Sequence, residues 1–153
     1  MSSSNKRIKT CDTYHHLMSR IAHKVYFLTE EVRTRFVEMI RRAADYCGIR
    51  LVAWCVMTNH FHILAYLPPP EDIDEEETLR RYGVLKGKVK LQILKAELFA
   101  MRQQIEGEQR ALRRLEEIRR PMYKIGEFMK IMFPPFFIAI TLITVCCLFV
   151  KAE

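Results

Sequence analysis

Two histidines separated by one hydrophobic residue, His60 and His62, are the side chains of this sequence best suited to chemistry. They stand in an apolar run, residues 54–67, that reads as two strands meeting at Thr58-Asn59. Because side chains alternate between faces along a strand and each residue rises about 3.3 Å, both histidines should project to one side, roughly 6.6 Å apart at the backbone. Their imidazoles can converge on one divalent metal ion, or they can be half-buried, hydrogen-bonded residues without a metal. A metal site would also need a third ligand from elsewhere in the chain.

Two further strands are predicted before the histidines. Residues 11–21 have a strand-like pattern that places alternate side chains on opposite faces, and residues 49–58 are apolar on both faces, as in the middle of a covered sheet. The first strand contains His15 and His16, and His23 follows it. These three histidines are possible neighbours of a metal, although a lone histidine on an apolar strand is more often a core or edge residue.

A helix is predicted between the two strands. Thr29 is a suitable N-cap, and Glu30 and Glu31 follow in the first turn, where the helix dipole favours negative charge. Gly48 should end the helix. Its predicted buried stripe consists of Val32, Phe36, Met39, Ile40, Ala43 and Cys47. The order strand, helix, strand, strand, followed by more helix, predicts an α+β domain with an antiparallel sheet and helices on one side.

The histidine strand, entered through Val56-Met57-Thr58-Asn59, resembles the HUH motif of the single-tyrosine transposases. These are the insertion-sequence-200-like and REP-associated enzymes that cut single-stranded DNA. Residues 14–20 resemble the first strand of that family, and the helix after Thr29 stands where its first helix would. The resemblance covers roughly residues 10–130 and implies the ferredoxin-like fold of the HUH endonucleases.

The resemblance also implies a reaction. Mg²⁺ or Mn²⁺ held by His60 and His62 would act as a Lewis acid on a phosphate of folded single-stranded DNA, especially a hairpin. A tyrosine hydroxyl would attack that phosphate and form a covalent phosphotyrosine link to the 5′ end, which a reverse step could rejoin to another end.

The nucleophile is expected on a helix near the C-terminus. Residues 121–131 resemble the start of the family's tyrosine-bearing helix, from which a third metal ligand also comes. Tyr123 and Glu127 stand one helical turn apart, so on a helix they would share a face as nucleophile and ligand. Tyr82 is another possible nucleophile. The basic and aromatic continuation of the family helix is missing, so a truncated relative that binds hairpin DNA without cutting it is the alternative.

Residues 71–132 are predicted to be a helical extension of the same domain. Pro68-Pro69-Pro70 ends the last strand, and Asp74 should cap the next helix. An apolar stripe then indicates a long helix or a helical hairpin that breaks near Gly107; its residues are Leu91, Leu94, Leu98, Met101, Ile105, Leu112 and Leu115. This stripe could form a homodimer, pack on the sheet, or pack on its own second half.

The net charge of +7 and a pI near 9.3 favour a polyanionic partner or an anionic membrane surface, with nucleic acid the simplest candidate. Solvated helix faces are the ordinary explanation for such basic residues. The side chains expected to contact DNA are Lys6 and Arg7 in a basic flexible arm (residues 1–10), with Arg20, Lys86, Lys88 and Lys90.

The C-terminal residues are apolar. Residues 131–150 carry no charge and would span about 30 Å as one helix, but only about 24 Å if the helix starts at Pro135. The tail, residues 133–153, is therefore a marginal membrane anchor or the product of a frameshift. Five cysteines without a Cys-x-x-Cys pair, and no signal peptide, indicate a reducing, cytoplasmic setting, with inner-membrane attachment possible through the tail. The core of the domain is assigned to residues 11–70.

Overall fold

The sheet consists of three antiparallel strands and a two-residue edge strand. The computed structural model describes residues 11–21, 30–57, 60–132 and 141–142. Within these ranges the strands are β1 (Thr13–Ile21), β2 (Arg50–Val56), β3 (His60–Leu67) and β4 (Thr141–Leu142). They pair in the order β2-β3-β1-β4, so β3 lies between the two strands that precede it in the chain.

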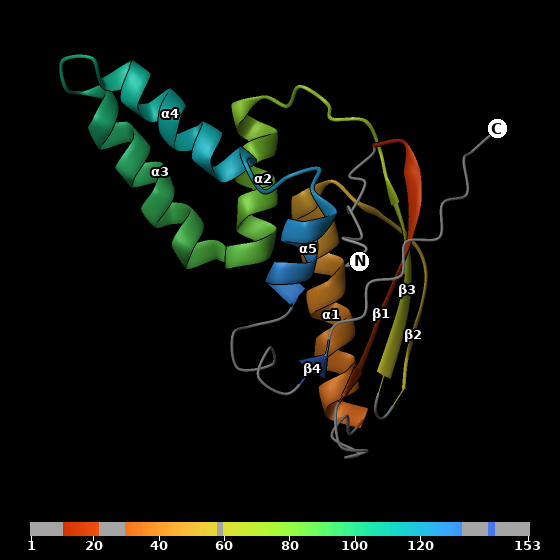
Figure 1. The fold of residues 1–153 in the computed structure, drawn as a ribbon. Helices are drawn as coiled ribbons and strands as arrows, with labels where there is room; N and C mark the ends of the chain where they lie inside the picture. Colours follow the sequence, from red (N-terminus) through yellow and green to blue (C-terminus); the bar gives the residue numbers. More distant parts are fainter. Residues whose placement is uncertain (1–10, 22–29, 58–59, 133–140, 143–153) are drawn as a thin grey trace.

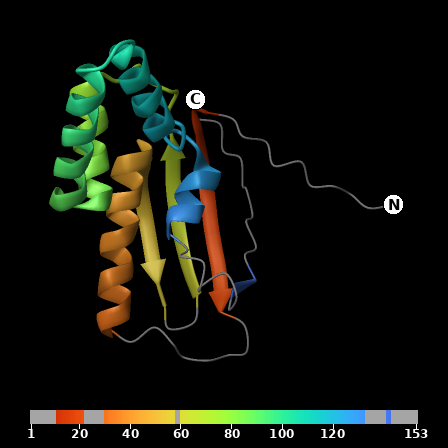
Figure 2. The same cartoon turned by 90° about the vertical axis from the view of Figure 1, so that its left-hand side faces the viewer.

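All of the described helices lie on one side of this sheet (Figure 1). They are α1 (Glu30–Cys47), α2 (Glu75–Lys86), α3 (Lys88–Arg102), α4 (Gly107–Arg119) and α5 (Ile125–Met132). Helices α1 and α5 pack together beside the sheet, and α2 to α4 extend away from it (Figures 1 and 2). This arrangement confirms the predicted α+β, ferredoxin-like architecture. We call the other side of the sheet the open face, because no described helix covers it.

Helix α1 forms as its sequence pattern predicts. Phe36, Ile40, Ala43 and Cys47 of the predicted stripe are buried, while the other two members are partly exposed. The helix ends at Gly48, whose φ of +66° lies in the left-handed region that glycine adopts without strain. A Cβ at this position would also lie only 2.6 Å from Nη1 of Arg81. Both the stripe and the stop signal are therefore confirmed.

Helices α3 and α4 form a hairpin rather than one long helix. Asp74 caps the preceding α2 by accepting a hydrogen bond from the backbone nitrogen of Glu77 at 2.8 Å, as predicted. In the hairpin, Leu94 and Leu98 are buried, as is Leu115 on the facing helix. Of the three packings considered, the stripe thus packs on its own second half. A homodimer stays a prediction.

The predicted apolar stripe is wrong at two positions. Ile105 is 95% exposed because it lies in the turn between α3 and α4, and Leu112 is exposed on the outside of α4. The break itself falls where it was predicted, since α4 begins at Gly107. A side chain could not replace this glycine, because its Cβ would lie 1.9 Å from the carbonyl oxygen of Met101.

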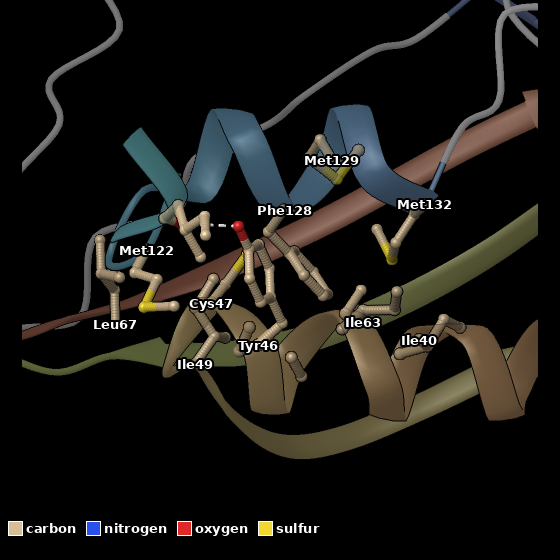
Figure 3. Packing of buried hydrophobic residues seen from close by; sticks show 14 of the residues in the cluster. Ile40, Tyr46, Cys47, Ile49, Ile63, Leu67, Met122, Phe128, Met129 and Met132 are labelled. Atoms are coloured by element: carbon tan, nitrogen blue, oxygen red, sulfur yellow. Dashed lines mark hydrogen bonds between the residues drawn. The ribbon is translucent and has the colours of Figure 1, made fainter. Parts of the chain in front are cut away.

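The main core lies between the sheet and the pair α1 and α5 (Figure 3). Phe128 from α5 is fully buried there and lies among side chains of α1 and β3, including Ile40 and Ile63. Tyr46 of α1 donates a hydrogen bond to the carbonyl oxygen of Ile118 at 2.7 Å, which ties the end of α4 to this core. Helix α5 is therefore fixed to the covered side of the sheet by apolar packing.

Several predictions fall outside the described residues. They include the basic arm with Lys6 and Arg7, the N-cap Thr29 and the turn Thr58-Asn59. Most of the apolar span 131–150 is also outside; its described parts are the end of α5 and the short strand β4. Within the described ranges, no helix is both long enough and apolar enough to span a membrane.

The burial of Phe128 gives a prediction for stability. We expect Phe128→Ala to lower the free energy of unfolding by about 3–5 kcal/mol, because it removes a fully buried ring and leaves a cavity. The matched control is Phe99→Ala, which removes the same group from a side chain that is 67% exposed and should cost less than about 1 kcal/mol. Urea unfolding of both variants measures the difference, and equal losses would contradict the packing described for α5.

Candidate functional site

The histidine pair, His60 and His62, lies on the open face of β3. Residues of this strand are alternately half-buried and fully buried, so Phe61 and Ile63 face the core while both histidines face the other way. The two imidazole centroids are 5.3 Å apart and the ring planes are nearly perpendicular, at 89°. The predicted strand and the shared face of the pair are therefore confirmed.

A third histidine from the neighbouring strand joins the pair. The Nε2 atom of His16 lies 2.9 Å from Nδ1 of His62, and the centroids of these two rings are 5.1 Å apart. The register of β1 against β3 causes this contact, because it places His62 directly opposite Met18, two residues beyond His16. Side chains in such diagonal positions on one sheet face can reach each other.

The other two histidines named from the sequence do not join this group. His15 faces the core, where it is 1% exposed and its Nε2 atom lies 2.9 Å from the hydroxyl of Thr13. His23 lies outside the described residues. Because side chains alternate between faces along β1, His15 points into the core and His16 points to the open face.

A shallow groove of about 510 Å³ on the open face adjoins the imidazoles of His16 and His62. It is lined by Tyr14, His16, Ala53, Trp54, Cys55, His62 and Leu64. Cys55 is exposed and pairs with His62 across the β2–β3 ladder. The ring of Tyr14 packs against Tyr66, with centroids 5.1 Å apart. The groove thus offers apolar and aromatic surface directly beside the histidine pair.

Imidazole donors suit a divalent transition metal, and His60 and His62 share one face at a separation that allows them to converge on such an ion. The described residues contain no set of three histidine, cysteine or acidic side chains arranged to hold a metal. His60 and His62 could therefore serve as two ligands of the implied ion, and no third ligand is found among the described residues.

Glu127, predicted as that third ligand, lies in α5 on the covered side of the sheet. Its carboxylate forms an ion pair with Lys130 at 2.8 Å. It also lies near the buried thiol of Cys47, whose pKa is raised to about 12 mainly by burial and secondly by this carboxylate. The expectation that Glu127 completes a site with the histidine pair is not supported by this placement.

Tyr123 does not lie on a helix, so the expected helical face shared with Glu127 is wrong. It precedes α5 and has a left-handed φ of +54°. Its backbone nitrogen donates to the carbonyl oxygen of Cys47 at 2.7 Å, and its hydroxyl accepts a hydrogen bond from Nη1 of Arg81 at 3.2 Å. These contacts fix Tyr123 at the end of α1, on the covered side of the sheet, away from the histidine pair.

The remaining predicted site residues are also distant from the pair or only partly described. Tyr82 packs against the core from α2. Lys86, Lys88 and Lys90 are exposed at the junction of α2 and α3, on the helical side of the molecule (Figure 1). The backbone of Arg20 pairs with that of His60 across β1 and β3. Contacts of these basic residues with DNA stay predictions.

Sequence reasoning missed the contact between His16 and His62 and the tyrosines beside it. The alternation along β1 does place Tyr14 and His16 on one face. What the pattern lacked was the register of β1 against β3, which decides which side chains of the two strands become neighbours.

A comparison with known families covers the part of the chain that contains the histidine pair. Residues 9–76 match the family described as "Transposase IS200 like". This part of the chain, which holds β1, α1, β2 and β3, is similar to the IS200-like transposase family, and the match supports a transposase-like function. No curated protein matches the chain.

The contacts that hold Tyr123 predict a pH dependence of stability. Glu77 accepts hydrogen bonds from Arg80 and Arg81, and these bonds lower the pKa of its carboxyl to about 2. Because this pKa is below the unfolded value of about 4.3, the carboxylate stabilises the fold above that pH. The stabilisation is lost as the pH falls from about 5 to about 2.

We expect Glu77→Gln to be less stable than the wild type by about 1 kcal/mol at neutral pH, since the ion pairs are partly exposed to solvent. The difference should disappear near pH 2. Glu76→Gln is the control, because it removes an exposed carboxylate from the same helical turn. Urea unfolding across this pH range tests the prediction, and a difference between Glu77→Gln and wild type that does not change with pH would refute it.

Proposed function

We propose that this chain binds single-stranded hairpin DNA on the open face of its sheet and acts in metal-dependent cleavage and joining of that DNA. The observation that carries the proposal is the histidine pair, which stands on the uncovered face of the domain that matches the transposase family. The groove beside the pair supports it, because aromatic surface can stack with unpaired bases. A positive net charge favours the same partner.

His60 and His62 would hold Mg²⁺ or Mn²⁺, which supplies Lewis-acid polarisation of the scissile phosphate. The side chains around the pair would bind and orient the strand, with bases over the groove and the phosphate at the imidazoles. A tyrosine hydroxyl then attacks phosphorus, the bond to the 3′ oxygen breaks, and the products are a 5′ phosphotyrosine link and a free 3′ hydroxyl.

A second candidate function is binding of hairpin DNA without cleavage. The placement of Tyr123 favours it, because the hydroxyl of this tyrosine is bonded to Arg81 on the covered side of the sheet. An active enzyme would need a tyrosine that reaches the open face. Among the described residues, Tyr14 and Tyr66 lie on that face as a pair, and Tyr14 lines the groove.

The two candidates differ in whether a covalent adduct forms. We expect the full chain, mixed with Mn²⁺ and a panel of single-stranded hairpins labelled at the 3′ end, to give a protein–DNA adduct on a denaturing gel. His60→Ala should reduce the adduct at least about 100-fold, because it removes one of two metal ligands. A duplex of the same sequence serves as the DNA control.

Tyrosine variants then identify the nucleophile. Loss of the adduct in Tyr123→Phe would mean that Tyr123 leaves its position beside Arg81 to react. If the adduct survives in Tyr123→Phe, the variants Tyr82→Phe and Tyr14→Phe are tested next. Hairpin binding by the wild type without any adduct would favour the second candidate. Failure to bind any hairpin more tightly than the duplex would refute both.

A further inference from the structure

We infer that His16 is a positioning residue that fixes the tautomer of His62 and turns the free nitrogen of this imidazole toward a ligand on the open face. The inference rests on the proposed function, since it concerns how the histidine pair is prepared for a metal ion and a phosphate. It assigns a role to a residue on a different strand from the HUH motif.

The contact between the two rings has the geometry of a direct hydrogen bond. Nε2 of His16 and Nδ1 of His62 are 2.9 Å apart, and the ring planes differ by only 14°. With nitrogens this close and centroids 5.1 Å apart, the rings meet edge to edge and nearly in one plane. In such an arrangement the lone pair of one nitrogen faces the N–H of the other.

Only one direction of this hydrogen bond leaves His62 able to bind a metal. A neutral imidazole carries a proton on one nitrogen and a lone pair on the other. If His62 donates through Nδ1–H to His16, its Nε2 keeps the lone pair and can bind a cation. If His16 donates instead, the proton of His62 is on Nε2 and the metal-binding position is blocked. Histidines that bind metals commonly donate their second N–H to a neighbouring acceptor in this way.

The strand register makes His16 a fixed neighbour of His62. Antiparallel pairing of β1 with β3 is continuous from Thr13 to Arg20, so the backbone positions of both rings are determined by the ladder. His15, the other histidine of β1, has a different kind of hydrogen-bond partner. His15 makes its hydrogen bond with Thr13, two residues away on the core side, whereas His16 bonds with a histidine of another strand that stands beside His60.

The tautomer can be measured directly in the metal-free protein. We would label the full chain with ¹⁵N-histidine and record two-bond ¹H–¹⁵N spectra at alkaline pH. The signals of His62 are identified by their loss in His62→Gln. We expect the proton of His62 on Nδ1 in the wild type, and on Nε2, the position favoured by a histidine side chain in water, in His16→Phe.

His16→Glu is the matched control, because an ionised carboxylate can only accept a hydrogen bond and should keep the proton of His62 on Nδ1. Thermal unfolding of both variants checks that each is folded. A wild-type protein with the proton on Nε2 of His62, or the same tautomer in wild type and His16→Phe, would overturn the inference.

A second readout separates this inference from the proposed function. We expect Mn²⁺ affinity, measured from the spin-resonance signal of free Mn²⁺, to fall about 10- to 100-fold in His16→Phe and to be retained in His16→Glu. An affinity unchanged in His16→Phe would overturn the inference even if DNA is cut. A wild type that binds no Mn²⁺ but holds the proton on Nδ1 would refute the metal-dependent function and leave the positioning of His62 supported.

Discussion

The two-residue period of β3 is the constraint on which both the fold and the candidate site depend. One row of its side chains, including Phe61 and Ile63, is buried against the helices, and the other row carries the histidine pair. Shifting the strand by one residue would place imidazoles in the core and expose the apolar row. The pairing of β3 with a strand on each side prevents such a shift, because both ladders would have to move together. Apolar packing of one row of side chains thus places the two histidines on the open face.

The helical half of the molecule is organised on the covered side and does not contribute to the open face within the described ranges. Helix α5 is held by Phe128 in the core, and the segment before it is held by Tyr123 through its contacts with Cys47 and Arg81. Arg81 in turn forms an ion pair with Glu77 of the same helix. These contacts explain why residues that resemble a catalytic helix in sequence occupy a structural position here.

The sequence was most informative where the signal is local. The stripe of α1, the stop at Gly48 and the cap at Asp74 each depend on neighbours within a few residues, and the structure has all three. The pattern could not determine the start of α5, because Tyr123 takes a left-handed backbone that is fixed by contacts with residues distant in sequence. The partner of His62 was hidden for the same reason, since only the strand register brings His16 to it.

The separation along the chain between the two histidines in contact has a consequence for folding kinetics. The hairpin of α3 and α4 closes between segments that are nearly consecutive, whereas the bond between His16 and His62 joins residues 46 positions apart. Closing a longer loop costs more chain entropy, and non-local strand pairing is the slower class of folding event. The imidazole cluster can exist only after β1 has docked on β3. The α3–α4 hairpin can therefore form through local contacts, while the histidine cluster has to wait for the non-local pairing of β1 with β3.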